Sequence, residues 1–349
     1  MKLPGPIVRS LARLSPWLFP IAAIGAMWEL VGGGWDINWH LLRIPEFFWT
    51  PPHLTLYSGA SVVLAATGAA FLLRWTPPQP TRSVQVGSVV AFLGALLQVG
   101  AGGFDSWWHA TYGADDALSP PHVMLTTAIL ITAVGVVVAL HAWRRMEPGR
   151  GLRAKITWVA HAIGVTAVAW AAWGWLFILT FPGFAAGSAR IPNFGFALLT
   201  SGAFASLFPL MLLLSAEVVR VRGAATASAL TQWIGFLTIT VLMGGEPTGL
   251  EVGLGIALFV LPGLAVDVLY RPGTRYSAYV ALAFGAILGQ WGFVPNGIVS
   301  AMTQPSGAPA AFALAFLAGG IGGALLALSL SRKAHDLVAQ DRTSISASA

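Results

Sequence analysis

The sequence predicts an all-α, polytopic integral membrane protein with about ten transmembrane helices. Only 9% of its 349 residues are charged, whereas a soluble domain carries roughly 25%. Hydrophobic residues make up 56% of the chain and the mean hydropathy is +0.74. So little charge cannot cover a water-soluble globule, but it suits a protein whose surface faces lipid.

Apolar runs of membrane-spanning length predict the individual helices. They lie near residues 16–34, 53–74, 84–104, 120–142, 156–180, 196–219, 224–245, 250–270, 277–295 and 308–331. The connections are short and contain helix breakers, as in Thr76–Pro80, Glu147–Gly149 and Arg271–Gly273. The chain therefore leaves no room for a soluble domain between the helices.

The basic residues predict the orientation of these helices in the membrane. If the N-terminus is cytoplasmic and every run crosses, 17 of the 19 Lys and Arg residues fall on the cytoplasmic side. Only Arg43 and Arg190 fall outside, as the positive-inside rule requires. Both termini are then cytoplasmic, in what we expect to be a bacterial or archaeal cytoplasmic membrane. A cleavable signal peptide over the first run is the alternative.

Three regions are expected along the chain. Residues 1–145 form a membrane unit that contains a duplicated helix–loop–helix, with repeats near 16–74 and 84–143. Residues 146–335 supply the remaining transmembrane helices. Residues 336–349, rich in Ser and Ala, predict a disordered tail.

The duplication is visible in two segments that align without a gap, at an offset of 69 residues. Residues 32–53 read GGGWDINWHLLRIPEFFWTPPH and residues 101–122 read AGGFDSWWHATYGADDALSPPH. The identical positions that carry chemistry are Asp36/Asp105, His40/His109 and His53/His122. Since two crossings separate the copies, both must emerge on the same side of the membrane, which the orientation above makes the outer side.

The spacing within each copy predicts a metal site. An Asp and a His four residues apart share one face of a helix, and a Pro-Pro pair suits the first turn of the next helix. Each copy thus brings one carboxylate and two imidazoles together, a recurring ligand set for copper, iron or zinc. The absence of cysteine excludes thiolate ligands. The expected ligands are Asp36, His40, His53, Asp105, His109 and His122.

Nearby acids extend this prediction. Glu46 and Asp115 each precede the last His of their copy by seven residues, and they could orient an imidazole from outside the ligand shell or bind directly. Glu29, two helical turns before Asp36, is a further candidate. The competing interpretation makes these Asp and His residues helix caps. A polar pattern kept at fixed spacing in both copies favours metal binding, and the sequence leaves open one joint site or two.

The pattern Asp-x3-His-x12-His, closed by Thr-Pro-x-His, resembles the C subunit of the copper membrane monooxygenases, the particulate methane and ammonia monooxygenases. The resemblance covers about 22 residues per copy. It implies copper sites at Asp36/His40/His53 and at Asp105/His109/His122, and it matches Glu46 and Asp115 to an acid of that family's loop. This chain departs from the family in its second copy, in its additional helices, and at Pro52 and Pro121, where the family has Ser.

Several functions stay open at this point. The resemblance implies a monooxygenase-like oxidoreductase that acts on a small hydrophobic substrate beside partner membrane subunits, although whether the chain is an enzyme is undecided. A transporter or permease would use the Asp/His repeats for cations or protons, and a non-catalytic subunit of a larger complex is the third class. A transporter should carry polar groups near the bilayer midplane, where the sequence shows few apart from His161. The net charge of +6 follows the topology and predicts no nucleic-acid partner.

Overall fold

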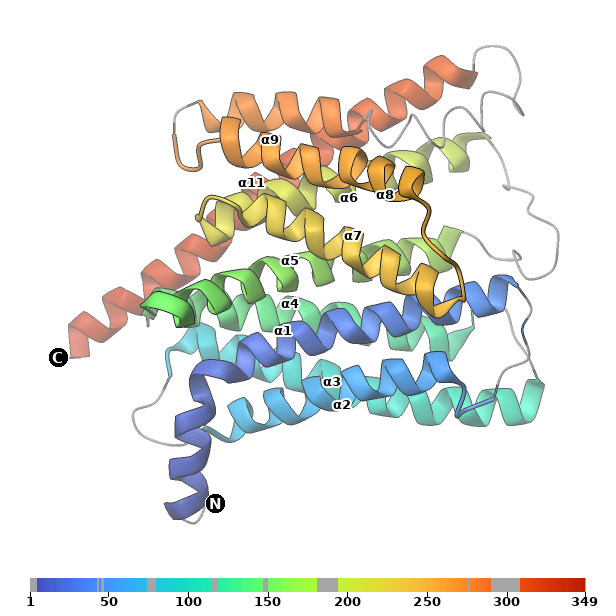
Figure 1. Ribbon diagram of the computed structural model, residues 1–349. Coiled ribbons are helices and arrows are strands. Elements are labelled where there is room, and N and C mark those ends of the chain that lie inside the picture. Colours follow the sequence, from blue (N-terminus) through green and yellow to red (C-terminus); the bar gives the residue numbers. More distant parts are fainter. Residues whose placement is uncertain are drawn as a thin grey trace. The chain divides into compact units, whose positions relative to one another are not determined.

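The structure is a computed structural model that describes residues 5–42, 44, 47–73, 80–113, 119–146, 150–180, 194–274, 276–289 and 308–348. Its regular secondary structure over these residues is entirely helical (Figure 1). The elements are α1 (Gly5–Leu41), α2 (Pro51–Leu73), α3 (Arg82–Tyr112), α4 (Pro120–Met146), α5 (Gly151–Thr180), α6 (Phe194–Val219), α7 (Ala224–Leu242), α8 (Gly249–Gly255), η1 (Ile256–Val260), α9 (Leu261–Leu269) and α11 (Ala308–Ser348). A shorter apolar helix spans Ser277–Gly289.

Nine helical segments in the described residues are long and apolar enough to cross a membrane. Together with the helix Ser277–Gly289, they correspond to the ten apolar runs of the sequence. Large apolar side chains such as Ile24, Leu93 and Val134 lie exposed on these helices, where lipid rather than water is their natural surrounding. The prediction of an all-α integral membrane protein is confirmed, whereas the side on which the termini lie stays a prediction.

The chain divides into two compact units, residues 1–171 with 334–349 and residues 172–333. Both α5 and α11 contribute to each unit. The division predicted at residues 145 and 335 stays a prediction. Helix α11 continues to Ser348, through the segment for which the sequence predicts disorder. Residues 332–342 contain many strong helix formers, including Arg, Lys, Ala, Leu and Gln, which favour this extension.

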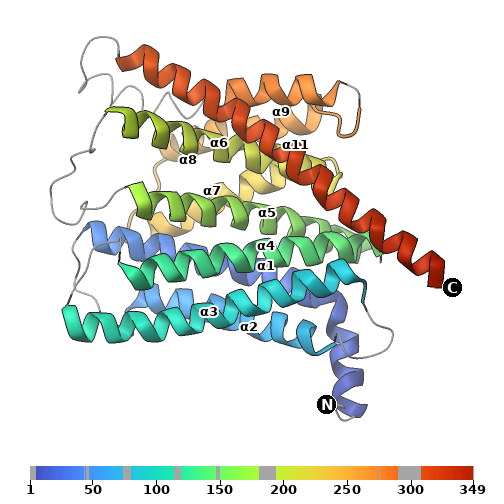
Figure 2. The ribbon, with the colours of Figure 1, turned by 180° about the vertical axis from the view of Figure 1, so that it is seen from behind.

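The first unit contains a bundle of α1 to α4. Helix α1 packs against α2 and α4, and α3 packs against the same two helices, so the four close into a ring. The C-terminal ends of α1 and α3 and the N-terminal ends of α2 and α4 lie at the same end of this bundle (Figures 1 and 2). We call it the motif end, because both copies of the repeated motif lie there.

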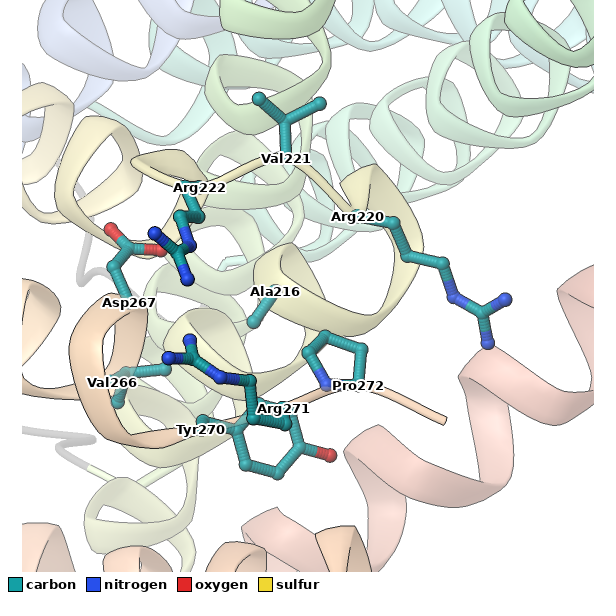
Figure 3. A pocket seen from close by; sticks show the side chains of 9 residues that line it. All are labelled: Ala216, Arg220, Val221, Arg222, Val266, Asp267, Tyr270, Arg271 and Pro272. Carbon is teal, nitrogen blue, oxygen red and sulfur yellow. The ribbon is translucent and has the colours of Figure 1, made fainter. Parts of the chain in front are cut away.

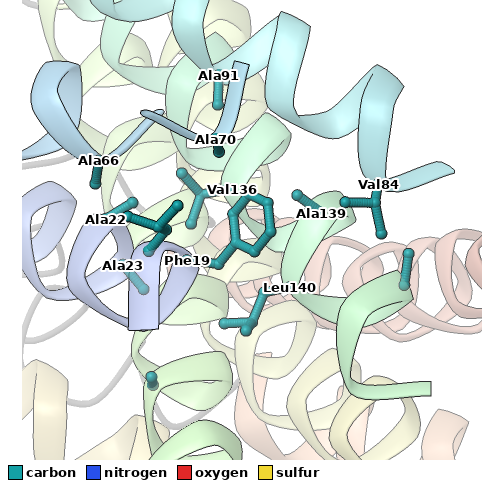
Figure 4. Packing of buried hydrophobic residues seen from close by; sticks show 13 residues of the cluster. Phe19, Ala22, Ala23, Ala66, Ala70, Val84, Ala91, Val136, Ala139 and Leu140 are labelled. Carbon is teal, nitrogen blue, oxygen red and sulfur yellow. The ribbon is translucent and has the colours of Figure 1, made fainter. Parts of the chain in front are cut away.

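Small residues allow these helices to approach closely. A Cβ atom added at Gly59 of α2 would lie 2.5 Å from the backbone nitrogen of Glu29 in α1, so only glycine fits at this crossing. Close contact through small residues is the usual way in which membrane helices associate. Away from the motif end, Phe19, Ala22, Val136 and Leu140 belong to a hydrophobic core (Figure 4). This core fixes the helices that carry the motifs.

The second unit contains a long helix with an irregular centre. Residues 249–269 run from α8 through the π-helical turn η1 into α9 as a single candidate span. Pro262 explains the wide turn, because its ring lacks an N–H and would collide with the carbonyl four residues earlier. A side chain in place of Gly255 would collide with the indole ring of Trp233. The irregular turn therefore still packs tightly against α7.

Candidate metal centre

The helix boundaries deliver the predicted ligands to one end of the bundle. Asp36 and His40 lie in the last turns of α1, and Asp105 and His109 lie in the last turns of α3. Helices α2 and α4 begin at Pro51 and Pro120, as the Pro-Pro pairs predict. His53 and His122 consequently lie in the first turns of the returning helices, opposite the Asp/His pairs.

The second motif forms a compact triad. The Asp105 Oδ1 atom lies 3.5 Å from His122 Nε2 and 3.6 Å from His109 Nε2. These distances are long for N–H···O hydrogen bonds, which cluster near 2.9 Å. Two ligands bound to one tetrahedral metal at 2.0–2.1 Å would lie about 3.3 Å apart. The spacing therefore suits three atoms arranged around an ion better than three atoms bonded to one another.

Burial makes this arrangement costly without a ligand. Asp105 is 5% exposed and His122 is 7% exposed. Among the described residues, Asp105 Oδ1 has no hydrogen-bond partner. A buried carboxylate oxygen left in this state is destabilising, and a cation bound between the carboxylate and the imidazoles would remove the cost. The residues present therefore fit a metal ion.

The first motif joins the second through His122. Asp36 Oδ2 lies 3.5 Å from His40 Nε2, and the second oxygen, Oδ1, lies 3.0 Å from His53 Nε2. One ligand atom each from Asp36, His40 and His122 lies within 4.8 Å of the others, and the same holds for Asp105, His109 and His122. The rings of His40 and His122 are 5.1 Å apart. His122 thus belongs to both groups, because α4 packs against α1 as well as α3.

Backbone carbonyl groups orient two of the imidazoles. His53 Nδ1 lies 3.2 Å from the Phe47 carbonyl oxygen, and His109 Nδ1 lies 3.2 Å from that of Gly113. A carbonyl can only accept, so each Nδ1 carries the proton and donates it. The Nε2 atoms then face Asp36 and Asp105, which is how metal-binding histidines are commonly oriented from outside the ligand shell.

These carbonyl contacts are functional features that sequence reasoning missed. The sequence made Glu46 and Asp115 candidates either for orienting an imidazole or for binding the metal directly, and both lie outside the described residues. A backbone carbonyl is present at every residue, so no residue type could have signalled the contacts of Phe47 and Gly113. The sharing of His122 was equally hidden, because it depends on how the two helix pairs pack.

Glu29 lies away from the ligand groups, inside the bundle. Two helical turns, about 10 Å, separate it from Asp36 along α1. It is fully buried, and Gln98 Nε2 lies 3.4 Å from its Oε1 atom and donates at 3.0 Å to Thr132 Oγ1. Glu29 and Gln98 are 69 residues apart, and hence occupy equivalent positions of the two copies. The structure does not bring Glu29 into contact with the metal centre as a ligand.

The assignment of this centre rests on the chain's own residues and their geometry. Comparisons of the chain with family models, with curated proteins and with solved structures found no match.

Proposed function

We propose that this protein is a multi-pass membrane protein that binds copper at one joint centre formed by both motifs. The proposed ligands are Asp36, His40, His53, Asp105, His109 and His122. The observation that carries the proposal is the buried Asp105 Oδ1 atom, which has no hydrogen-bond partner in the described chain although two imidazole nitrogens face it at 3.5 and 3.6 Å.

Copper is the metal that the ligand set and the sequence resemblance favour together. Imidazole and carboxylate suit copper, iron and zinc, and divalent copper binds most tightly to a given set of such ligands. The resemblance to the C subunit of copper membrane monooxygenases points to the same metal. Iron and zinc are the alternatives that metal analysis would reveal.

A redox role, as an oxygenase component, agrees best with this centre. Bound copper would supply one-electron redox chemistry. Asp36 and Asp105 would balance the ion's charge, while the carbonyls of Phe47 and Gly113 hold two imidazoles in place. Apolar helices would admit a small hydrophobic substrate from the bilayer, beside partner membrane subunits. The positive-inside distribution supports a centre on the outer side of the membrane.

Metal analysis of the detergent-purified protein tests the proposal. We expect one or two copper ions per chain by elemental mass spectrometry, with nitrogen hyperfine structure from imidazole in the electron paramagnetic resonance spectrum. Protein that is folded yet stays metal-free after copper loading would refute the metal centre and leave a role as a helix-end scaffold.

A pair of double variants tests whether the centre is joint. Asp36→Ala with His40→Ala, and Asp105→Ala with His109→Ala, should each remove more than half of the bound copper, because both groups depend on His122. The control is His335→Ala with Asp336→Ala, an adjacent His and Asp outside the centre. A loss of half the copper from each double variant would instead show two independent sites.

A transport function is the second candidate, favoured by the buried Glu29–Gln98–Thr132 contacts. These three residues lie near the middles of the candidate spans Ser15–His40, Arg82–Tyr112 and Pro120–Met146, where transporters place their binding groups. Copper and proton flux into proteoliposomes would test it. Flux that Glu29→Gln abolishes, with copper content unchanged, would support transport, whereas flux equal to that of protein-free vesicles would exclude it.

A further inference from the structure

The second unit contains a cavity of about 210 Å³ among the ends of three helices (Figure 3). Its lining includes Arg220 and Arg222 from the turn between α6 and α7, and Asp267, Tyr270 and Arg271 from the end of α9 and the turn after it. The candidate spans end at Val219, begin at Ala224 and end at Leu269. The cavity therefore lies at the level where a membrane-spanning segment meets the lipid headgroups.

The acidic side chains at this cavity already have partners. Asp267 caps the N-terminus of α7, since its carboxylate accepts from the backbone N–H groups of Ala225 at 3.2 Å and Thr226 at 2.8 Å. The Thr226 hydroxyl donates to it as well, at 2.6 Å. A carboxylate held in this way mainly offsets the positive end of the helix dipole. Asp267 is therefore held at the start of α7, and no ion pair joins it to an arginine in the described residues.

Glu217, buried beside the cavity, also has partners, but these are side chains. It accepts a hydrogen bond from the Tyr270 hydroxyl and lies 3.7 Å from Arg220 Nη2. Burial, with the Glu217 carboxylate, raises the pKa of Tyr270, so this hydroxyl remains a donor. The charges of Glu217 and Arg220 offset each other.

Two arginine side chains at this cavity have no partner among the described residues. In the described part of the chain, the guanidinium groups of Arg222 and Arg271 make no hydrogen bond or ion pair. Both extend on the side of the cavity where Asp267 lies, whereas Arg220 points away (Figure 3). Arg222 and Arg271 carry two positive charges and Asp267 carries one negative charge, so the cavity has a net charge of about +1. Arg220 also adopts a left-handed backbone conformation, with φ of 52°, which is unusual for a residue other than glycine.

We propose that this cavity binds a phosphate group, with Arg222 and Arg271 as its main ligands. Guanidinium groups bind phosphate oxygens in a bidentate manner. A phosphodiester carries one negative charge, which matches the net charge of the cavity, and basic pockets at helix ends hold anionic lipid headgroups. An anionic phospholipid is therefore the favoured source and free inorganic phosphate the other. This site is independent of the proposed metal centre, because all of its residues lie in the second unit.

Native mass spectrometry of the delipidated full-length protein tests this site. We expect one phosphatidylglycerol molecule to be retained in preference to phosphatidylcholine of the same acyl chains. Arg222→Gln with Arg271→Gln should weaken its retention by at least about tenfold, and Arg222→Lys with Arg271→Lys should weaken it less. Arg332→Gln, which removes a basic residue outside the cavity, should leave retention unchanged.

Competition distinguishes the two sources of phosphate. Phosphatidylglycerol that stays bound in millimolar inorganic phosphate indicates a lipid site, whereas binding of inorganic phosphate alone, lost in the double Gln variant, indicates a free-phosphate site. Equal retention of both lipids without phosphate binding, or a double Gln variant that binds like the wild type, overturns the proposal. A single size-exclusion peak and an unchanged helical circular dichroism spectrum show that each variant is folded.

Discussion

The two copies of the motif carry the same ligands at the same spacing, yet their side chains make different contacts. In the first copy, His53 lies 3.0 Å from Asp36 of the same copy. In the second copy, His122 contacts Asp105 more loosely, at 3.5 Å, and also approaches His40 of the first copy. The same motif has therefore produced a histidine that contacts one aspartate, His53, and a histidine that belongs to both ligand groups, His122.

Neighbouring residues that differ between the copies explain this asymmetry. The ring of Tyr57 stacks on His53, with centroids 5.8 Å apart, and the Phe47 carbonyl holds its Nδ1 atom. The position equivalent to Tyr57 is Thr126, whose hydroxyl donates to the His122 backbone instead. Thr126 has no ring, and the ring of His122 instead lies near those of His40 and His109, one from each Asp/His pair. The comparison teaches that the two ligand groups are joined by the position of His122, which the repeated sequence alone does not specify.

The largest predicted effect is that of His122→Ala on copper binding. Since His122 belongs to both ligand groups, its loss should weaken copper binding by more than about 100-fold, beyond the usual cost of losing a contact outside the ligand shell. His53→Ala, at the equivalent position, should weaken it clearly less. Copper titration of chelator-stripped protein in detergent measures both.

Equal losses of affinity in these two variants would mean that the copies form symmetrical sites. A greater loss in His53→Ala would reverse the roles assigned here. His122→Gln is the control for the space that the alanine substitution leaves. Its amide fills much of that space, so it should lose copper affinity as well if the imidazole of His122 is what binds the metal.

The next effect concerns the stability of the metal-free protein. Asp36→Asn should lower its unfolding free energy by about 1.5–3 kcal/mol, because a charge-assisted contact with His53 is lost. Asp105→Asn should leave it unchanged or raise it, since Asp105 Oδ1 lies no closer than 3.5 Å to an imidazole nitrogen and the substitution removes a buried charge. Thermal unfolding in chelator distinguishes them, and equal destabilisation would contradict the geometry described for the two copies.

The sequence was sufficient to predict the membrane helices and the position of each proposed ligand. The Pro-Pro pairs located the starts of α2 and α4, and the four-residue spacing placed Asp36 with His40 on one helix face. It could not predict that His122 is shared, because this depends on contacts between α4 and α1. Nor could it predict the midplane contacts of Glu29, since its partner Gln98 lies on a different helix.

A smaller effect is expected from Gly59→Ala, which tests the packing that differs between the helix pairs. The added methyl would lie 2.5 Å from the Glu29 backbone nitrogen, so α1 and α2 must separate, at a cost of about 1–3 kcal/mol. The equivalent position of the second copy is Ala128, which already carries a methyl group. Gly103→Ala is the matched control, because its Cβ would meet nothing within 4 Å. Equal melting temperatures for the two variants would show that α1 and α2 are not packed so closely.

The smallest effect should follow from Glu29→Gln, which gives both copies a glutamine at the equivalent positions 29 and 98. The new amide can donate to Gln98 Oε1, a buried atom without a hydrogen-bond partner in the described residues, and the substitution removes an ionisable group from the membrane interior. We expect an unfolding free energy that is unchanged or raised by up to about 1 kcal/mol. Copper content should also be unchanged, since two helical turns separate Glu29 from Asp36. Loss of copper in this variant, with its unfolding free energy preserved, would instead make Glu29 part of the metal centre.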